Sequence, residues 1–557
     1  MLKEMGAELE TFLQPLRSIH LHSHLLAELG ANSDIRIIFT LAAIAAVILL
    51  MACINFMNLA TARAAGRGKE VGLRKVLGAN RRELTAQFLG ESLIFTFLSS
   101  FLAVFASRLL LPQFRALSGR DITLDFLQMP AFAAGLVGII LLVGFAAGSY
   151  PALFLSSFQP VAALKGNLHL GGRGGLLRSA LVVFQFAVTT VLIIGAMVIF
   201  KQQKYMQNKD LGFEKRNLYV VALQNDEVRI ALESFKNELL KIDGVKGAGA
   251  SSMVPGEMYL FNSGVYPEGL GRDQVFLMDN FLVDHGFLDT LEVEVVEGRG
   301  FSRLITTDAA DAVMINETAA RELEWDDPVG KMIEIPAGDN PVRKIVIGVF
   351  RDIHQRSLYS RVDPTFIQYV GTEGPIENRA RRLSLRLQTD DPAGTAAAVE
   401  QKWKEYFPNH PYYAFYLDAF YDGQHRSEQR LGGLYRVFAG LAVAIGCLGL
   451  LGLASFTAQR RTKEIGIRKV MGSSEGSIVV LLVRKFVTLI AIANVLAWPV
   501  AFYSMHKWLE NFPYPVNLDA GVFVVTALLT LLVALLAVGR QSLKAAHASP
   551  VDSLRHE

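Results

Sequence analysis

The chain is poor in cysteine and has no nucleotide-binding motif. Its 557 residues include only two cysteines, Cys53 and Cys447, and both fall inside long apolar runs. The polar stretch at 203–430 contains none, so disulfide bonds do not hold it together. No G-x-x-x-x-G-K-[ST] sequence occurs; GSSEGS at 472–477 has glycines but no lysine and is interpreted as a turn before a helix. The sequence therefore predicts no nucleotide hydrolysis by this chain.

Patterns for catalysis, metal binding and nucleic-acid binding are missing as well. The histidines of the polar stretch have no H-E-x-x-H spacing; they are His285, His354, His410 and His425. The apolar runs contain almost no charged side chains, which disfavours an ion-coupled carrier. A membrane enzyme needs a clustered catalytic constellation, and none is found. Basic residues lie beside apolar runs instead of forming an aromatic-laced stripe, so no nucleic-acid partner is expected. We expect no catalytic residue, metal or cofactor in this chain.

Long apolar runs are what the sequence does have. The chain is 51% hydrophobic with a mean hydropathy of +0.32, a membrane-protein composition. A helix needs about 20 apolar residues to cross a bilayer. Uncharged runs of that order lie at 37–62, 126–164, 179–200, 437–459, 486–505 and 520–539. A further run at 92–111 contains only Arg108, which can snorkel to the head groups. The sequence therefore predicts seven membrane spans.

Basic residues beside the spans give the orientation. The segments 63–82, 165–178, 460–469 and 540–555 are rich in lysine and arginine, and the positive-inside rule places all four in the cytoplasm. Residues 203–430, the short loops at 112–125 and 507–519, and residues 1–33 are then extracytoplasmic. Because residues 1–33 have neither a signal peptide nor a preceding span, we interpret them as the remnant of a first extracytoplasmic domain.

An internal repeat organises the chain. Residues 69–78 read KEVGLRKVLG and residues 463–472 read KEIGIRKVMG, identical at seven of ten positions. A second landmark recurs after the third span of each copy, as QPVAALK at 159–165 and SPVDSLR at 549–555. The expected order is a remnant domain (1–33), a three-helix module (34–166), a linking transmembrane helix (178–202), an extracytoplasmic domain (203–430) and a second three-helix module (431–557).

The extracytoplasmic stretch has the composition of a soluble mixed domain. Strands are predicted at Leu218–Ala222, Lys344–Phe350 and Leu383–Leu387, and a helix near Thr395–Tyr406. Another helix carries Val228, Leu232, Phe235, Leu239 and Ile242 at helical spacing. The predicted fold class is thus an α-helical integral membrane protein, two three-helix modules plus one linking helix, with an α+β extracytoplasmic domain of one or two lobes.

Each repeated loop has the features of a docking surface. Glu70 and Arg74, and Glu464 and Arg468, are spaced four apart, as helical ion pairs are. A solvated amphipathic helix that obeys the positive-inside rule is the plain interpretation of one such loop. Topology alone, however, does not require the same glycines and the same glutamate in two copies. Gly72 and Gly466 allow close backbone approach, while Gly78 and Gly472 are expected to end the short helices before Asn80 and Ser473 begin the next ones.

These motifs resemble the FtsX/MacB-like permease family of ABC transporters. VMINETAARELEWDDPVGKMIEI at 313–335 and VIGVFRDIHQRSLYSRVDPTFI at 346–367 are similar to segments of that family's periplasmic core domain. The resemblance implies that each repeated loop is a coupling helix resting on an ATPase subunit. The ATPase-coupling residues that it implies are Lys69, Glu70, Gly72, Arg74, Lys75, Gly78, Lys463, Glu464, Gly466, Arg468, Lys469 and Gly472.

The resemblance implies a multi-pass protein of the bacterial inner membrane that acts with a dimeric ABC ATPase, which would bind ATP and Mg²⁺. Membrane lipid and an envelope or outer-membrane protein are further expected partners. Two functions remain open: export or extraction of a peptide, lipid or lipoprotein, and a non-transporting complex that regulates a cell-envelope enzyme. Within the spans, Asn55, Asn58 and Asn494 are expected to hydrogen-bond between helices, as packing residues do.

Overall fold

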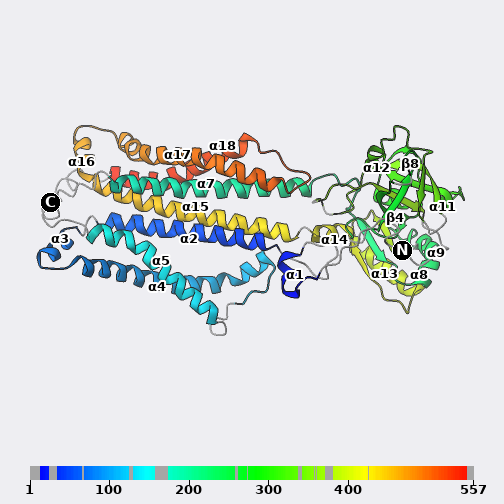
Figure 1. Cartoon of the computed structure of the whole chain (residues 1–557), viewed down its shortest axis with the longest axis horizontal. Coiled ribbons are helices and arrows are strands. Elements are labelled where there is room, and N and C mark those ends of the chain that lie inside the picture. Colours follow the sequence, from blue (N-terminus) through cyan, green and yellow to red (C-terminus); the bar gives the residue numbers. More distant parts are fainter. Residues whose placement is uncertain are drawn as a thin grey trace. The chain divides into compact units, whose positions relative to one another are not determined.

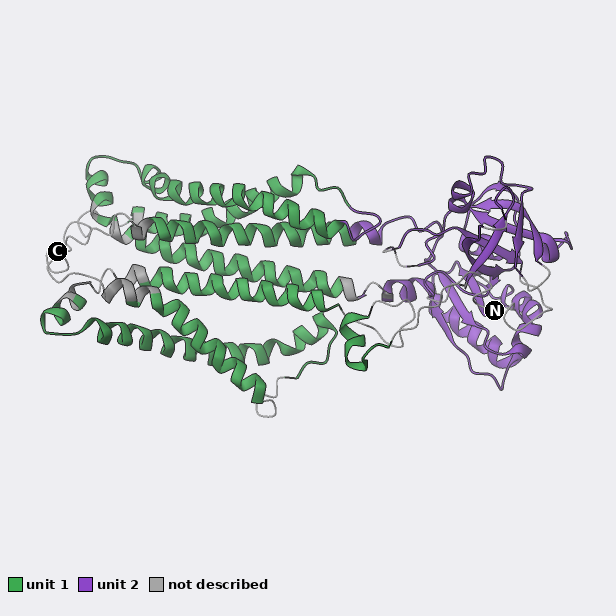
Figure 2. Ribbon diagram, viewed as in Figure 1, with its two compact units in different colours: residues 1–203, 429–509, 516–557 green, residues 204–428, 510–515 purple. Residues whose placement is uncertain are grey.

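The computed structural model describes residues 13–23, 34–64, 68–123, 130–156, 173–257, 261–271, 274–336, 341–356, 358, 360–369, 380–424 and 426–547. The chain divides into two compact units, shown in different colours in Figure 2. Unit 1 comprises residues 1–203, 429–509 and 516–557, and unit 2 comprises residues 204–428 and 510–515. The second landmark of each repeat, at 159–165 and 549–555, lies outside the described residues.

Unit 1 is helical, and the described part of it contains seven helices long and apolar enough to cross a membrane, which confirms the predicted number. These helices are α2 (Ile35–Ala64), α4 (Arg81–Ser118), α5 (Pro130–Ser156), α7 (Arg173–Gln207), α15 (Arg426–Arg460), α17 (Glu475–Leu509) and α18 (Ala520–His547). A short helix, α1 (Leu16–His22), precedes them. Both α4 and α17 begin before the apolar runs that predicted them, because capped polar turns extend each helix toward its N-terminus.

The two modules repeat element by element. Helices α2, α4 and α5 form module 1 with the short α3 (Gly68–Val76), and α15, α17 and α18 form module 2 with the short α16 (Thr462–Val470). The second motif begins 394 residues after the first, at 463 against 69, and α3 and α16 begin and end at positions related by the same interval. The sequence repeat is therefore a repeat of structure.

Polar side chains join the helices inside unit 1. Helices α2 and α15 run side by side (Figure 1), and Asn55 Nδ2 donates a hydrogen bond of 2.6 Å to the Ile445 carbonyl oxygen. The repeat counterpart of Asn55 is Gly449, whose missing side chain leaves room for the Asn55 amide. In module 2, Asn494 Nδ2 donates to Thr530 Oγ1 at 3.2 Å, and Thr190 Oγ1 of α7 donates to Asn494 Oδ1 at 3.4 Å. The predicted interhelical hydrogen bonds are confirmed for Asn55 and Asn494 but not for Asn58, whose buried side-chain amide has no hydrogen-bond partner among the described residues.

Two apolar clusters hold α7 on module 2. Leucine, phenylalanine and alanine side chains fill the contact, and small residues let the helix axes approach closely. The first cluster contains Val182, Phe186, Leu450, Ala454, Phe486, Ile490, Ala493, Ala534, Ala537 and Val538. The second contains Ile194, Val198, Ala501, Leu509, Val522 and Phe523.

The described residues of unit 2 form an α+β domain with one sheet of 11 strands. The strands are β1 (Leu218–Ala222), β2 (Val245–Ser251), β3 (Phe261–Pro267), β4 (Phe276–Val283), β5 (Val295–Gly298), β6 (Ala312–Asn316), β7 (Met332–Ile335), β8 (Val342–Phe350), β9 (Thr365–Tyr369), β10 (Arg382–Leu387) and β11 (Ala414–Tyr416). The helices are α8 (Asp226–Ile230), α9 (Leu232–Leu239), α10 (Phe287–Leu291), α11 (Asp308–Asp311), α12 (Glu317–Glu322), α13 (Pro392–Tyr406) and α14 (Leu417–Gln424).

The sheet order gives unit 2 two lobes. Strands β11-β1-β10-β2 are antiparallel, and α9 and α13 cover them through a core around Phe235 and Trp403. The order β4-β3-β7-β8-β6-β9 returns to β4, because β9 also pairs in parallel with β4. The strands predicted at Leu218–Ala222, Lys344–Phe350 and Leu383–Leu387 and the helix at Thr395–Tyr406 are confirmed. The single helix predicted over 228–242 is wrong: it is broken at Ala231, whose ψ of 2° leaves helical geometry.

Six residues of unit 2 come from an unexpected place in the chain. The sequence assigns the loop at 507–519 to the second membrane module, whereas residues 510–515, between α17 and α18, cluster with unit 2. Phe512 packs against the main core of unit 2. Aromatic side chains explain this assignment, because Phe512 packs on the apolar core and the Tyr514 ring contacts His354 and Lys209.

Candidate functional site

Helices α3 and α16 end in the same way. Gly78 and Gly472 have φ of +99° and +88°, the left-handed conformation that favours glycine at the end of a helix. In α3 the Gly78 and Ala79 amides donate to the carbonyl oxygens of Lys75 and Arg74. In α16 the Gly472 and Ser473 amides donate to those of Lys469 and Arg468. The predicted role of the two glycines as helix stops is confirmed.

The next helix begins three residues beyond each glycine. Asn80 is the N-cap of α4, and its backbone amide donates to Glu83 Oε2 at 3.0 Å, as in a capping box. Helix α17 begins at Glu475, and Ser474 Oγ accepts a hydrogen bond of 3.3 Å from the Ser477 amide. The cap predicted at Ser473 therefore lies one residue later, at the repeat counterpart of Asn80.

The charged side chains of α16 form the expected local pair. Glu464 Oε1 lies 2.9 Å from Arg468 Nη2, four residues apart on one helix face. Lys469 Nζ lies 3.8 Å from Glu475 Oε1, which ties the end of α16 to the start of α17. Gly466 is buried. Such exposed pairs add little stability.

In α3 the described side chains differ in detail. Arg74 Nη1 donates to Gln87 Oε1 of α4 at 2.6 Å. Burial, with help from the Arg81 charge, lowers the pKa of Lys75 from its ordinary value. The surroundings of Gly72 and the side chains of Lys69, Glu70 and Lys463 lie outside the described residues. The Glu70–Arg74 pair thus stays a prediction.

One buried apolar residue anchors each short helix to the spans. Val71 is 2% exposed and packs with Leu84 and Phe88 of α4 and Ala152 of α5. Its counterpart Ile465 is 4% exposed and packs in module 2 with a matching set: Ile478, Leu482 and Ala546. Each short helix therefore packs against two long helices, α3 against α4 and α5, and α16 against α17 and α18.

Opposite the anchor, each short helix exposes apolar side chains that the sequence analysis did not single out. Large apolar residues are normally scattered singly on a surface, yet three follow one another at i, i+3 and i+4 in each copy. They are Leu73, Val76 and Leu77 in module 1 and Ile467, Val470 and Met471 in module 2, between 54% and 81% exposed. The sequence contained a signal for this exposed face. At positions 73 and 77 the two motifs differ, yet in both copies the residue is apolar.

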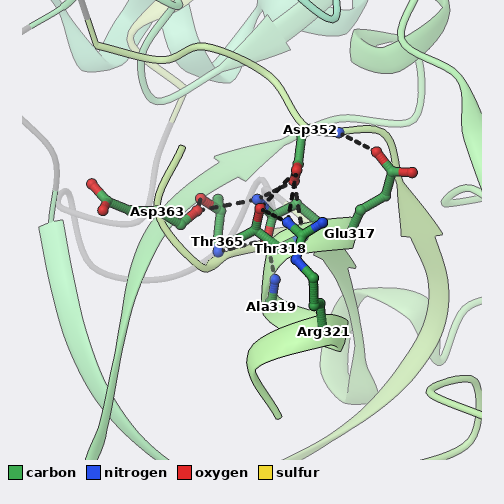
Figure 3. A network of polar contacts seen from close by, with 8 residues as sticks. Glu317, Thr318, Ala319, Arg321, Asp352, Asp363 and Thr365 are labelled. Carbon is green, nitrogen blue, oxygen red and sulfur yellow. Dashed lines mark hydrogen bonds and ion pairs between the residues drawn. The ribbon is translucent and has the colours of Figure 1, made fainter. Parts of the chain in front are cut away.

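A polar network in unit 2 joins the two segments that resemble the periplasmic core domain (Figure 3). The Asp352 carboxylate accepts hydrogen bonds from the Thr318 amide and hydroxyl, at 2.9 and 2.7 Å, and from Asn316 Nδ2 at 2.8 Å. Glu317 Oε2 accepts in return from the Asp352 amide at 3.0 Å. Asp352 thereby fixes the start of α12 against the end of β8, so the network holds the fold in place.

Residues 510–515 contact unit 2 at His354, which lies two residues beyond Asp352. The rings of His354 and Tyr514 meet edge to face, with centroids 5.4 Å apart. Lys209 Nζ lies 4.0 Å from the centre of the Tyr514 ring, a cation–π contact. Burial, reinforced by the Lys209 charge, lowers the pKa of His354 to about 4. His354 is therefore neutral near pH 7, which suits a ring enclosed beside a lysine.

An ion-pair cluster in unit 2 is centred on Arg356, two residues beyond His354. Arg356 reaches Asp279 Oδ1 at 3.3 Å and Asp363 Oδ2 at 3.2 Å, so one guanidinium bridges two carboxylates. Burial raises the pKa of Asp279 to about 6; the Arg356 charge opposes this shift and the Asp363 charge adds to it. Asp279 is 4% exposed, which explains why desolvation outweighs the ion pair.

Comparisons with known proteins match both parts of the chain. The family model of the FtsX-like permease C-terminal domain matches residues 42–160 and 436–550, and that of the MacB-like periplasmic core domain matches residues 181–402. The macrolide export ATP-binding/permease protein MacB of Bdellovibrio bacteriovorus is 33% identical over 132 residues, 22% of this chain and 19% of that protein. The uncharacterized ABC transporter permease YvrN of Bacillus subtilis is 25% identical over 287 residues, 49% of this chain and 69% of that protein.

A solved structure is also similar to part of this chain. The periplasmic region of MacB from Actinobacillus actinomycetemcomitans covers 38% of this chain and 94% of its own, at 13% identity and a TM-score of 0.28. The chain thus spans about a fifth of the length of the B. bacteriovorus MacB that it matches.

The modules and the domain between them define a multi-pass α-helical protein of the bacterial inner membrane with an α+β extracytoplasmic domain. The chain belongs to the FtsX/MacB-like family of ABC transporter permeases.

Proposed function

We propose that this chain couples ATP hydrolysis by a separate ATPase dimer to movement of its extracytoplasmic domain. In this scheme ATP and Mg²⁺ are bound by the partner, and α3 and α16 each rest on one ATPase subunit. The work performed is the export or extraction of a peptide, lipid or lipoprotein at the outer face of the membrane. The observation that carries the proposal is the repeated construction of α3 and α16, which share a register, a glycine stop, a buried anchor and an exposed apolar face.

Topology alone does not require this repetition. Retention in the cytoplasm needs positive charge but neither exposed apolar residues nor a wedge against the spans. Two-fold ATPase dimers offer two equivalent surfaces, and a chain with two equivalent short helices suits such a partner. The exposed Leu73, Val76 and Leu77, like their counterparts in α16, would supply an apolar centre, with the adjacent lysine and arginine side chains forming the rim.

Affinity purification tests this proposal. The tagged chain, recovered from native membranes, is expected to bring down an ATPase with a phosphate loop and ATP-hydrolysing activity. Replacing Val76 and Val470 by aspartate should abolish recovery, because a buried charge without a partner is costly at an interface. Alanine at Glu70, Arg74, Glu464 and Arg468 should weaken it. A matched control is Leu304→Asp, since Leu304 is 94% exposed in unit 2.

The outcome also separates the two functions. Nucleotide-dependent release of a peptide, lipid or lipoprotein from membranes supports transport. Recovery of a cell-wall hydrolase whose activity follows the ATPase, with no cargo released, supports the regulatory function instead. Recovery of the intact chain without any ATPase contradicts both.

A further inference from the structure

The two short helices are followed by unlike charges, although the rest of their construction repeats. Residues 69–83 contain five basic and two acidic side chains, whereas their counterparts at 463–477 contain three basic and two acidic ones. The net charge of the segment is therefore +3 in module 1 and +1 in module 2. The largest change lies at one repeat position, where Arg81 begins α4 and Glu475 begins α17.

The contacts at this position have opposite signs in the two modules. Glu475 Oε1 lies 3.8 Å from Lys469 Nζ, and Glu475 Oε2 lies 3.4 Å from His547 Nε2 at the end of α18. In module 1 the counterpart of Lys469 is Lys75, whose pKa is lowered by burial and also by the charge of Arg81. A carboxylate thus joins the short helix to its spans in module 2, while two cations repel each other in module 1.

The basic residues that begin α4 are unfavourable for that helix. The N-terminus of a helix carries a partial positive charge, which favours acidic side chains in the first turn. Glu475 satisfies this preference in α17, whereas Arg81 and Arg82 oppose it in α4. Retention in the cytoplasm does not require them, because residues 63–75 already contain five basic side chains. Two exposed arginines at an unfavourable position therefore indicate contact with a partner of negative charge.

The level of these arginines along the helix favours a protein over lipid head groups. The apolar run of α4 begins at residue 92, ten residues after Arg82, which corresponds to about 15 Å of helix. A head-group layer is only about 5–8 Å thick on each side of the bilayer. In module 2 the basic residues Arg484 and Lys485 come directly before the apolar run and lie at the head-group level. The arginines of α4 extend well beyond that level.

We propose that the two short helices bind the ATPase in different ways. Helix α3 docks through acidic groups of its ATPase subunit that pair with Arg81 and Arg82, and α16 docks chiefly through its apolar face. This inference rests on the proposed function. Charge pairs at the rim of an interface weaken as salt screens them, whereas apolar contacts do not. Docking of α3 is therefore sensitive to salt, and docking of α16 is not.

Protection of a cysteine on each short helix tests this difference. In a chain with Cys53 and Cys447 replaced by alanine, Val76→Cys and Val470→Cys are introduced singly, and the chain is placed in phosphatidylcholine nanodiscs with an excess of the co-purified ATPase. The rate of modification by N-ethylmaleimide, with and without ATPase, gives a protection factor for each helix. From about 50 mM to about 300 mM sodium chloride, protection should fall about tenfold at Val76→Cys and less than about twofold at Val470→Cys.

The repeat supplies matched variants. Glu475→Arg should make protection at Val470→Cys fall with salt. Arg81→Glu should lower protection at Val76→Cys and remove its dependence on salt. Arg120→Glu makes the same charge reversal at an exposed residue just beyond the other end of α4 and should change neither helix.

The outcomes separate this inference from the proposed function. Equal salt dependence at the two cysteines would overturn the inference and leave the proposed function standing. Absence of protection at both cysteines at the lower salt would contradict the proposed function and the inference with it. Protection of Val76→Cys without ATPase, in nanodiscs that contain phosphatidylglycerol, would show that the arginines bind lipid head groups and would also overturn the inference. The salt series on the two cysteine variants decides the matter even where a charge-reversed variant fails to fold.

Discussion

Lys209 Nζ lies 4.0 Å from the centre of the Tyr514 ring, although the two residues come from opposite ends of unit 2 in the sequence. Tyr514 belongs to residues 510–515, the segment that joins α17 to α18. The ring of His354, two residues after Asp352 of the polar network, also contacts the Tyr514 ring, edge to face. The segment is therefore built into unit 2 and is more than a loop between spans.

We predict that Tyr514→Leu weakens the packing of residues 510–515 within unit 2. Leucine keeps apolar contact but removes the ring face, so about 1 kcal/mol of cation–π attraction should be lost. Hydrogen exchange of the amides at 352–355 in the purified chain measures the effect. Lys209→Met should destabilise the Tyr514→Leu variant less than it destabilises the parent chain, since the two residues share one interaction. Tyr503→Leu, at a residue 68% exposed on α17, is the control. Simple additivity of the Lys209 and Tyr514 changes would contradict the contact.

A pH-dependent stability is expected from Asp279. Its pKa in the folded chain, about 6, lies above the ordinary 3.8, so the folded state binds this proton more tightly. The contribution is complete below about pH 4 and is lost as the pH rises through about 6, at most about 3 kcal/mol. His354, with its pKa lowered to about 4, acts in the opposite sense and destabilises as the pH falls.

Comparing the pH dependence of stability in the parent chain and in Asp279→Asn separates the contribution of the Asp279 carboxyl group from that of His354. Opening free energies of the β4 amides, followed by hydrogen exchange from pH 4 to pH 7, should fall more steeply with rising pH in the parent than in the variant. Asp326→Asn, at an exposed aspartate of unit 2, should behave as the parent. Parallel curves for parent and Asp279→Asn would refute the assignment.

The glycine stops of the short helices are predicted to be sensitive to a single methyl group. At φ of +99° and +88°, alanine at Gly78 or Gly472 costs roughly 1 kcal/mol through backbone strain. Faster amide exchange at the end of α3 or α16 reports this loss. Gly476 lies in the first turn of α17, where an added Cβ meets open space, so Gly476→Ala should be neutral or stabilising. Equal behaviour of all three variants would argue against the helix stops.

Replacement of Asn494 should loosen α7. Asn494→Leu removes the hydrogen bonds with Thr190 and Thr530, and interhelical bonds of this kind contribute about 0.6 kcal/mol each on average. A lower thermal unfolding temperature in detergent is expected, and Thr190→Val should reproduce part of it. Ser100→Leu, at the repeat counterpart in module 1, has no such bond to lose. Identical losses for Asn494→Leu and Ser100→Leu would mean that the amide does not fasten α7.

The sequence predicted what regular patterns encode. Apolar runs specified seven spans, and the KEVGLRKVLG repeat specified α3 and α16 together with Gly78 and Gly472 as their ends. Less regular features could not be predicted from the sequence. The exposed face of Leu73, Val76 and Leu77 is visible only once Val71 is known to point inward. The place of Tyr514 in unit 2 depends on contacts with Lys209 and His354, which no local pattern records.

Crosslinking from both short helices tests directly whether α3 and α16 each rest on an ATPase subunit. In a chain with Cys53 and Cys447 replaced by alanine, Val76→Cys and Val470→Cys are introduced singly, and each is probed with a bifunctional thiol–amine reagent in the presence of the co-purified ATPase. We predict that both positions crosslink to the ATPase and that the crosslinking yield differs between ATP and ADP. Crosslinking from only one helix, or yields indifferent to the nucleotide, would contradict it.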